Sequence, residues 1–138
     1  MRLAMLALLL PLFASAGPLP RTPAPTGAKL YFISPADGAK LKSPLTVRFG
    51  LAGMGVAPAG IVQEATGHHH LLVDVETLPP MDLPIPNDAR HRHFGGGQTE
   101  VTIELPPGRH TLQLLLGDAN HIPHHPPVIS EPITVEVE

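Results

Sequence analysis

The chain has 138 residues with 9 basic and 12 acidic side chains, no cysteine and nine histidines. The formal net charge of −3, with histidine neutral, gives no electrostatic case for binding nucleic acid. Without cysteine there is no disulfide, and no thiolate can act as a metal ligand or a nucleophile. A metal site in this chain must therefore use imidazole, carboxylate, amide or thioether groups.

The first 16 residues have the pattern of a secretory signal peptide. Arg2 precedes an apolar run at residues 3–13, and the small residues Ala14-Ser15-Ala16 form a cleavage pattern. The apolar run is too short to cross a bilayer, which takes about 20 apolar residues. We therefore expect a bacterial protein that is periplasmic or secreted, with no membrane span after cleavage.

The rest of the chain suits one domain. Residues 17–27 contain Pro18, Pro20, Pro23 and Pro25 and no core-forming pattern, so they are expected to be a proline-rich linker. Residues 28–138 are long enough for a single hydrophobic core. The predicted organisation is thus a signal peptide over 1–16, a linker over 17–27 and one domain over 28–138.

Short strands are predicted along the whole domain. Alternation is clearest where Leu45, Val47 and Phe49 share one face. Strands are expected at residues 29–33, 45–51, 69–75, 99–105, 110–117 and 132–137, with an irregular edge strand somewhere in 76–90. No window has a helical period. The sequence therefore predicts an all-β fold, an immunoglobulin-like antiparallel β-sandwich of six or seven short strands, with a β-barrel as the structural alternative.

Three consecutive histidines lead into the strand at 69–75. Because side chains alternate along a strand, His68 and His70 face one side, while His69 faces the other side with Leu71. Residues two apart on a strand are about 7 Å apart, so His68 and His70 can reach one metal ion. His69 is expected to be a hydrogen-bonded histidine at the edge of the core rather than a ligand.

The predicted topology brings distant histidines to one end of the domain. If strand directions alternate, the loops at 52–68, 91–98 and 118–131 share one end, and His110 lies at the other. The strands at 69–75 and 110–117 are expected to be neighbours in one sheet. The loops and adjoining strand ends at this end carry eight histidines: His68, His69, His70, His91, His93, His121, His124 and His125.

This convergence predicts a site for a divalent transition metal. Neutral imidazole is a good ligand for Cu(II), Zn(II) and Ni(II), and copper or zinc is expected. Asp118 could be a further ligand, or it could fix the tautomer of a ligating imidazole. The histidines could also be solvated residues of strand ends and loops. The candidate metal ligands are His68, His70, His121, His93, His124 and Asp118.

Several long stretches carry a family resemblance. They include His68-His69-His70 within residues 66–72, residues 50–60 and 106–118, and the His121 and His124 motif within 120–128. From about Leu30 to the end, the chain resembles the bacterial family catalogued as domain of unknown function 4399. The resemblance implies an exported bacterial protein without an established activity. At the level of architecture, the protein also looks like periplasmic copper-resistance carriers.

Three functions remain open. The first is metal binding for buffering or transfer. The second is a structural module without metal that binds another envelope protein. The third, a hydrolytic enzyme, would need three histidine ligands and an open position for water. The sequence contains neither G-x-S-x-G nor H-E-x-x-H, so catalysis is not expected.

Overall fold

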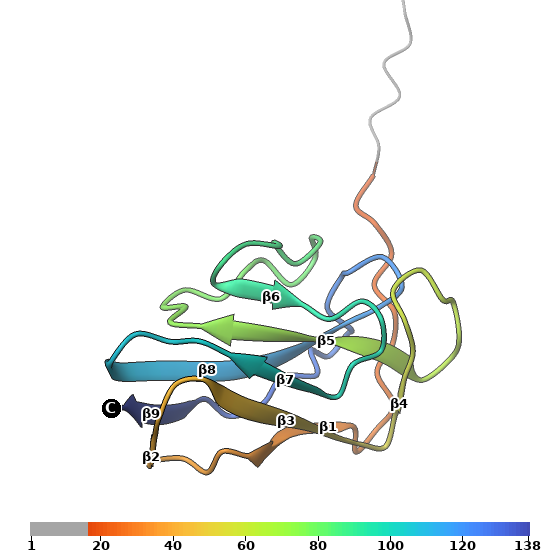
Figure 1. Ribbon diagram of the computed structural model, residues 1–138. Helices are drawn as coiled ribbons and strands as arrows, with labels where there is room; N and C mark the ends of the chain where they lie inside the picture. Colours follow the sequence, from red (N-terminus) through yellow and green to blue (C-terminus); the bar gives the residue numbers. More distant parts are fainter. Residues whose placement is uncertain (1–16) are drawn as a thin grey trace, which may run out of the picture.

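The computed structural model describes residues 17–138, and the predicted signal peptide at residues 1–16 lies outside them. The described residues form nine strands in two sheets, which confirms the all-β prediction (Figure 1). Within this part of the chain, no helix is long and apolar enough to cross a membrane.

The smaller sheet has three antiparallel strands. Their order is β1 (Lys29–Ser34), β3 (Leu45–Ala52) and β7 (Glu100–Ile103). As predicted, β3 alternates between buried and exposed residues over its first five positions. On its outer face, Thr46 pairs with Thr102 at 2.9 Å, and Arg48 donates to the Glu100 carboxylate at 3.0 Å.

The larger sheet carries the histidine-rich strand near one edge. Its order is β2 (Ala39–Leu41), β9 (Ile133–Val137), β8 (Gly108–Gly117), β5 (Thr66–Val73) and β4 (Gly55–Val56). A further short strand, β6 (His91–His93), also pairs with β5. The predicted neighbours β5 and β8 do pair, antiparallel. The β2–β9 and β4–β5 pairs are parallel, so the predicted antiparallel sandwich differs from the structure in the direction of these two short pairs.

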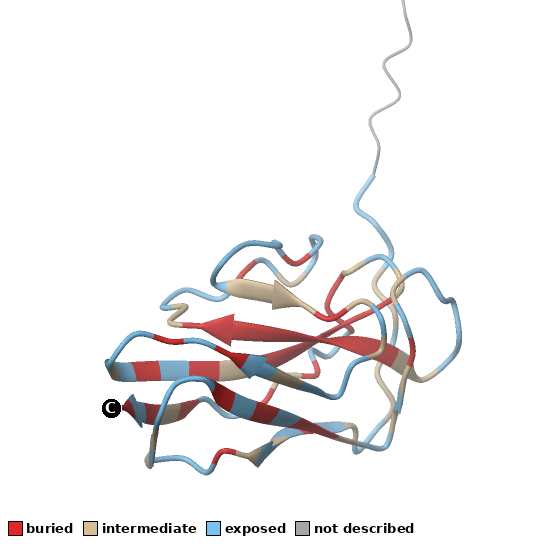
Figure 2. Ribbon diagram, in the orientation of Figure 1, coloured by how far each residue is buried: buried red, intermediate tan, exposed pale blue. Residues whose placement is uncertain are grey.

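The main core lies between the two sheets. Val47 and Phe49 of the smaller sheet belong to the same buried cluster as Leu71, Leu114 and Val135 of the larger one. Figure 2 shows alternating burial along β3 and β9, whereas β5 is buried almost throughout. The larger sheet is therefore covered on both faces along β5.

Loops cover the outer face of the larger sheet. Leu72 of β5 and Leu115 of β8 form a second small apolar cluster with Ile85, and Met81 and Ile129 pack against it. Ile85 lies in the proline-rich segment after β5, and Ile129 lies in the long loop after β8. The histidines on the outer face of β5 are consequently shielded from solvent by chain from both loops.

Three short strands differ from the prediction. The irregular strand expected in 76–90 is absent from that segment, and β6 forms instead at residues 91–93. Several prolines in 76–90 cannot donate to a sheet, which explains the displacement. The strands β2 and β4 were not predicted because two or three residues are too few to show a periodic pattern.

The proline-rich segment at 17–27 is extended, but part of it is attached to the domain. The Ala24 amide donates to the His125 carbonyl at 3.0 Å, and the His125 amide donates to the Thr22 carbonyl at 2.9 Å. The Arg21 guanidinium also donates to the carbonyl oxygens of Pro123 and His124. This segment therefore lies alongside the loop after β8 and restrains it (Figure 1).

Candidate metal centre

Three imidazoles come together on the outer face of the larger sheet. Alternation along β5 places His68 and His70 on this face, as predicted. The antiparallel β5–β6 register then places His93 directly opposite His70. The ring centroids are 4.8 Å apart for His68 and His70, 5.1 Å for His70 and His93, and 5.0 Å for His68 and His93.

A fourth imidazole comes from the loop after β8. The His121 ring centroid lies 4.8 Å from that of His93, 5.0 Å from that of His68 and 6.3 Å from that of His70. His121 has a backbone φ of 66°, and its amide donates to the Asp118 carbonyl at 2.9 Å. We call His68, His70, His93 and His121 the four-histidine cluster. Three segments distant along the chain contribute to it.

Three members of the cluster could hold a metal ion. One ring nitrogen from each of His68, His70 and His93 lies within 4.8 Å of the other two. With metal–nitrogen bonds of about 2.1 Å, ligand nitrogens in a tetrahedral site are about 3.4 Å apart. To reach that spacing, the ligand nitrogens would need to approach one another by at most about 1.4 Å.

Four of the six ring nitrogens of this group are buried without a hydrogen-bond partner among the described residues. His68 Nε2, both ring nitrogens of His70 and His93 Nε2 are buried and have no partner among residues 17–138. Buried polar atoms normally have partners, and each one left without costs about 1–3 kcal/mol. A metal ion among these rings would give three of the nitrogens a partner at once.

Burial and mutual proximity keep the imidazoles of His68, His70 and His93 neutral. Burial, reinforced by the nearby rings of His121 and His93, lowers the pKa of His68 to about 4. Burial and the neighbouring histidines lower the pKa of His70 to about 3. The pKa of His93 is also lowered, by burial and then by His121. Near neutral pH these rings are therefore uncharged, and each has a lone pair available for a metal.

Two glycines leave room for the rings. Gly117 of β8 lies opposite His68, and a Cβ at Gly117 would lie 2.7 Å from Cε1 of His70. A Cβ at Gly95 would lie 2.7 Å from Nε2 of His93. Any side chain at either position would displace a ring. Neither glycine was predicted, because a glycine in a turn or at a strand end gives no distinct signal in the sequence.

The structure does not bring His124 and Asp118 into the ligand group. His124 is buried, and its Nε2 donates to the Thr66 carbonyl at 3.0 Å. Asp118 Oδ1 accepts from the amides of Asn120 and Ile122, and Oδ2 accepts from the Thr22 hydroxyl at 2.7 Å. Asp118 thus holds the loop that carries His121.

His69 differs from its prediction in one respect. It points away from the cluster, as expected, and its ring packs 5.0 Å from that of Phe49. It is fully buried, and neither ring nitrogen has a partner in the described part of the chain. The predicted hydrogen-bonded boundary histidine is therefore wrong. Burial lowers its pKa to about 4, so the ring is neutral.

His110 lies away from the cluster and has a structural role. Its Nδ1 donates to the Asp74 carboxylate and its Nε2 to the Pro106 carbonyl, each at 2.7 Å. Burial lowers the pKa of His110, but the bonds to Asp74 and Pro106 outweigh it, and the net pKa is raised. A charged imidazole with two acceptors is not available as a ligand.

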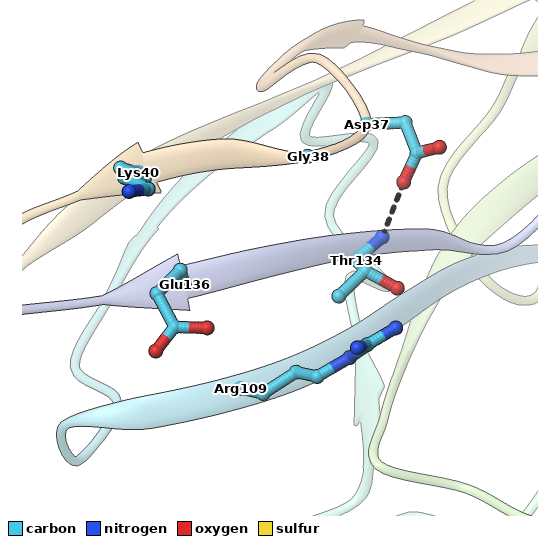
Figure 3. Close-up of a pocket in the computed structure, with 6 residues that line it drawn as sticks. All are labelled: Asp37, Gly38, Lys40, Arg109, Thr134 and Glu136. Atoms are coloured by element: carbon cyan, nitrogen blue, oxygen red, sulfur yellow. Dashed lines mark hydrogen bonds between the residues drawn. The ribbon is translucent and has the colours of Figure 1, made fainter.

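Two hollows in the surface of the described residues are candidate sites. One of about 270 Å³ adjoins the cluster and is lined by His70, Pro84, Ile85, Asn87, His93 and His121. A larger one of about 550 Å³ lies over β2, β9 and β8 (Figure 3). There the Asp37 carboxylate accepts from the Thr134 amide at 2.8 Å, and Lys40, Arg109 and Glu136 complete a wall of mixed charge. Only the first hollow adjoins a group of potential metal ligands, so it is the functional candidate.

Comparison with known proteins identifies a family for this chain but no individual protein that matches it. Residues 47–138 match the family model described as domain of unknown function (DUF4399). The matched range includes all four histidines of the cluster. No curated protein and no solved structure matches the chain.

Proposed function

The chain belongs to the DUF4399 family, whose description names no activity, and we propose from the site itself that the protein binds a divalent transition metal. The ligands are His68, His70 and His93. The observation that carries this proposal is the group of buried ring nitrogens without partners among the described residues. Metal coordination explains why so many imidazoles are buried together.

The donor set favours copper or zinc. Its ligand atoms are neutral imidazole nitrogens, which suit Cu(II) and Zn(II), whereas Mg²⁺ and Ca²⁺ prefer oxygen. The chain has no cysteine for a thiolate-bound ion. Between the two metals, nitrogen ligands bind Cu(II) more strongly in general. The proposed cargo or cofactor is therefore Cu(II), with Zn(II) as its nearest competitor.

The proposed role is buffering or transfer of the metal outside the cytoplasm. The signal-peptide pattern of residues 1–16 supports export to the periplasm or the medium. His93 is only partly buried, and a hollow reaches the cluster from the surface, so a bound ion would be able to exchange. A partner that gives or takes the metal would approach from this side.

The experiment is a metal titration of untagged residues 17–138. Metal content is measured by elemental analysis, and affinity by competition with a coloured chelator. We expect one Cu(II) or Zn(II) per chain. The double variant His68→Ala/His70→Ala should lose at least about 100-fold in affinity, since changes to groups that only support ligands already cost 10–100-fold.

The matched control is His91→Ala. His91 lies on β6 two residues from His93, but its Nδ1 donates to Asp88 at 2.9 Å, and it is not in the ligand group. This variant should bind metal like the parent chain. Failure of the parent chain to bind Cu(II), Zn(II) or Ni(II) would remove the metal proposal and favour a structural envelope module that binds another protein.

A further inference from the structure

We propose that the bound metal keeps one coordination position open toward the 270 Å³ hollow, and that this position takes a small anion from solution. The inference rests on the proposed metal site and adds the class of ligand that the site accepts. The anion would displace a metal-bound water, with no other change in bonding. It would lie between His121 and the rim residue Asn87.

The charge of the site favours an anion. Three neutral imidazoles leave the full double charge of the ion uncompensated in a poorly solvated place. The carboxylate that acts on His68 is Asp118, and both its oxygens already accept hydrogen bonds from Thr22 and from loop amides. No carboxylate is among the described residues that line the hollow. A small anion from solution would supply the negative charge that the described lining residues lack.

The position of the hollow fits an open coordination site. Two of its lining residues, His70 and His93, are members of the ligand group. His68 and His70 project from β5, and His93 projects from β6 on the same face of the sheet. The hollow adjoins two of the three rings on that face, so an ion held by them would be reached from the hollow.

His121 is placed to contact the anion rather than the metal. Its ring lies edge-on to those of His68 and His70, with interplanar angles of 82° and 79°. It is not among the residues whose ligand atoms lie within 4.8 Å of one another. An imidazole ring carries an N–H that can donate to a bound anion. This differs from the expectation that His121 is itself a ligand.

The walls of the hollow are fixed and its volume limits the guest. The Ile85 amide donates to the His121 carbonyl at 2.8 Å, which ties the two covering loops together. Drug-sized ligands occupy pockets of about 300–1,000 Å³. A hollow of about 270 Å³ therefore suits an anion of a few heavy atoms, such as azide or a small carboxylate.

The test uses Cu(II)-loaded residues 17–138 and sodium azide. Copper content is first verified as one per chain, so failure of the metal site is seen before azide is added. Azide should then produce a saturable copper–azide charge-transfer band in the near-ultraviolet spectrum. An equal concentration of sodium perchlorate, which coordinates poorly, should produce none.

Two variants locate the anion. His121→Ala should keep copper affinity within about threefold and weaken azide binding about tenfold or more, the effect expected for losing a hydrogen bond to a charged group. Asn87→Trp should block the rim of the hollow and lower the affinity for azide at least tenfold without changing the affinity for copper. His91→Ala should change neither.

Three results would overturn the inference. Copper binding at one per chain without any azide band would leave the metal site intact and remove the open position. A loss of copper affinity of about 100-fold in His121→Ala would show that His121 is a fourth ligand that closes the site. An azide band unaffected by both His121→Ala and Asn87→Trp would place the anion elsewhere.

Discussion

His93 lies directly opposite His70 across the β5–β6 pair, with ring centroids 5.1 Å apart. Because β6 has only three residues, this one register decides whether the loop after β5 contributes a ligand. A shift of β6 by one residue would turn His93 to the other face of the sheet. The pairing of a three-residue strand therefore sets the position of the third proposed ligand.

Substitution of Gly117 by alanine should impair the site through His70. The new Cβ would lie 2.7 Å from Cε1 of His70, so the ring must move. We expect at least a tenfold loss of metal affinity and a loss of about 1–3 kcal/mol in the free energy of unfolding. Metal titration and urea denaturation measure these effects. Gly55→Ala is the control, because its Cβ would lie 3.6 Å from Thr66 Cγ2, an ordinary contact. Equal metal affinity in the two variants would contradict the proposed crowding.

The metal-free protein should lose stability steeply in mild acid. His68 and His69 have folded-state pKa values of about 4 and His70 of about 3, below the ordinary 6.5. At a pH between the ordinary value of 6.5 and the folded-state values, these three histidines are protonated in the unfolded chain but not in the folded one. The unfolded chain therefore binds up to three more protons. The free energy of unfolding therefore falls as the pH falls below about 6.5, by up to about 4 kcal/mol per pH unit.

Urea denaturation at pH 7, 6 and 5 measures this slope. His69→Leu should reduce the slope by about a third, because one of the three titrating groups is removed. The same variant should keep its metal affinity, since His69 points away from the cluster. A slope unchanged by His69→Leu would show that this ring is not buried in its neutral form.

The Asp74–His110 pair should show a different pH dependence. Burial raises the pKa of Asp74, but the bonds from His110 and the Thr111 amide outweigh it, and the net pKa is lowered. The raised pKa of His110 stabilises the fold below about pH 6.5, and this contribution is lost as the pH rises through the folded-state value. The lowered pKa of Asp74 stabilises the fold above about pH 3.8, and this contribution is lost in stronger acid.

Asp74→Asn tests this pair. Asparagine tolerates the backbone φ of 54° at this position, so the change acts mainly on charge. We expect the free energy of unfolding to fall by about 1 kcal/mol between pH 4 and 6.5, a small loss because the carboxylate is partly exposed. The loss should be smaller at pH 9. Metal affinity should not change. A loss that grows between pH 6.5 and 9 would contradict the assigned charges.

The attached N-terminal segment should hold the His121 loop in place. Thr22→Val removes the hydroxyl that donates to Asp118 and should lower the free energy of unfolding by about 1 kcal/mol. The amides of Asn120 and Ile122, which donate to the same carboxylate, should exchange faster with deuterated solvent. Thr46→Val is the control, because its hydroxyl pairs with Thr102 on the smaller sheet. Unchanged exchange at Asn120 and Ile122 would show that the segment does not restrain this loop.

Alternation and strand order were enough to predict part of the site. The period of two along β5 separates His68 and His70 from His69, and the β5–β8 pairing brings the loop with His121 to the same end. The same pairing predicted His121 near His70, and the His121 ring does lie beside those of His68, His70 and His93, but the sequence also left His124 as a candidate. His121 has a positive φ and His124 donates to the Thr66 carbonyl, and neither feature has a local sequence signal.

The remaining features depend on tertiary packing. A strand as short as β6 has no periodic pattern, so the pairing of His93 with His70 could not be derived. The need for glycine at Gly117 appears only when the His70 ring is placed against β8. The attachment of residues 22–24 to the loop after β8 joins segments about 100 residues apart. Proline content predicted extension there but not contact.

The most direct measurement is a crystal structure of residues 17–138 loaded with Zn(II) or Cu(II), with anomalous diffraction collected at the metal absorption edge. We predict one strong anomalous peak about 2.0–2.1 Å from a ring nitrogen of each of His68, His70 and His93. A peak bound elsewhere on the chain, or no peak in crystals grown with stoichiometric metal, would contradict it.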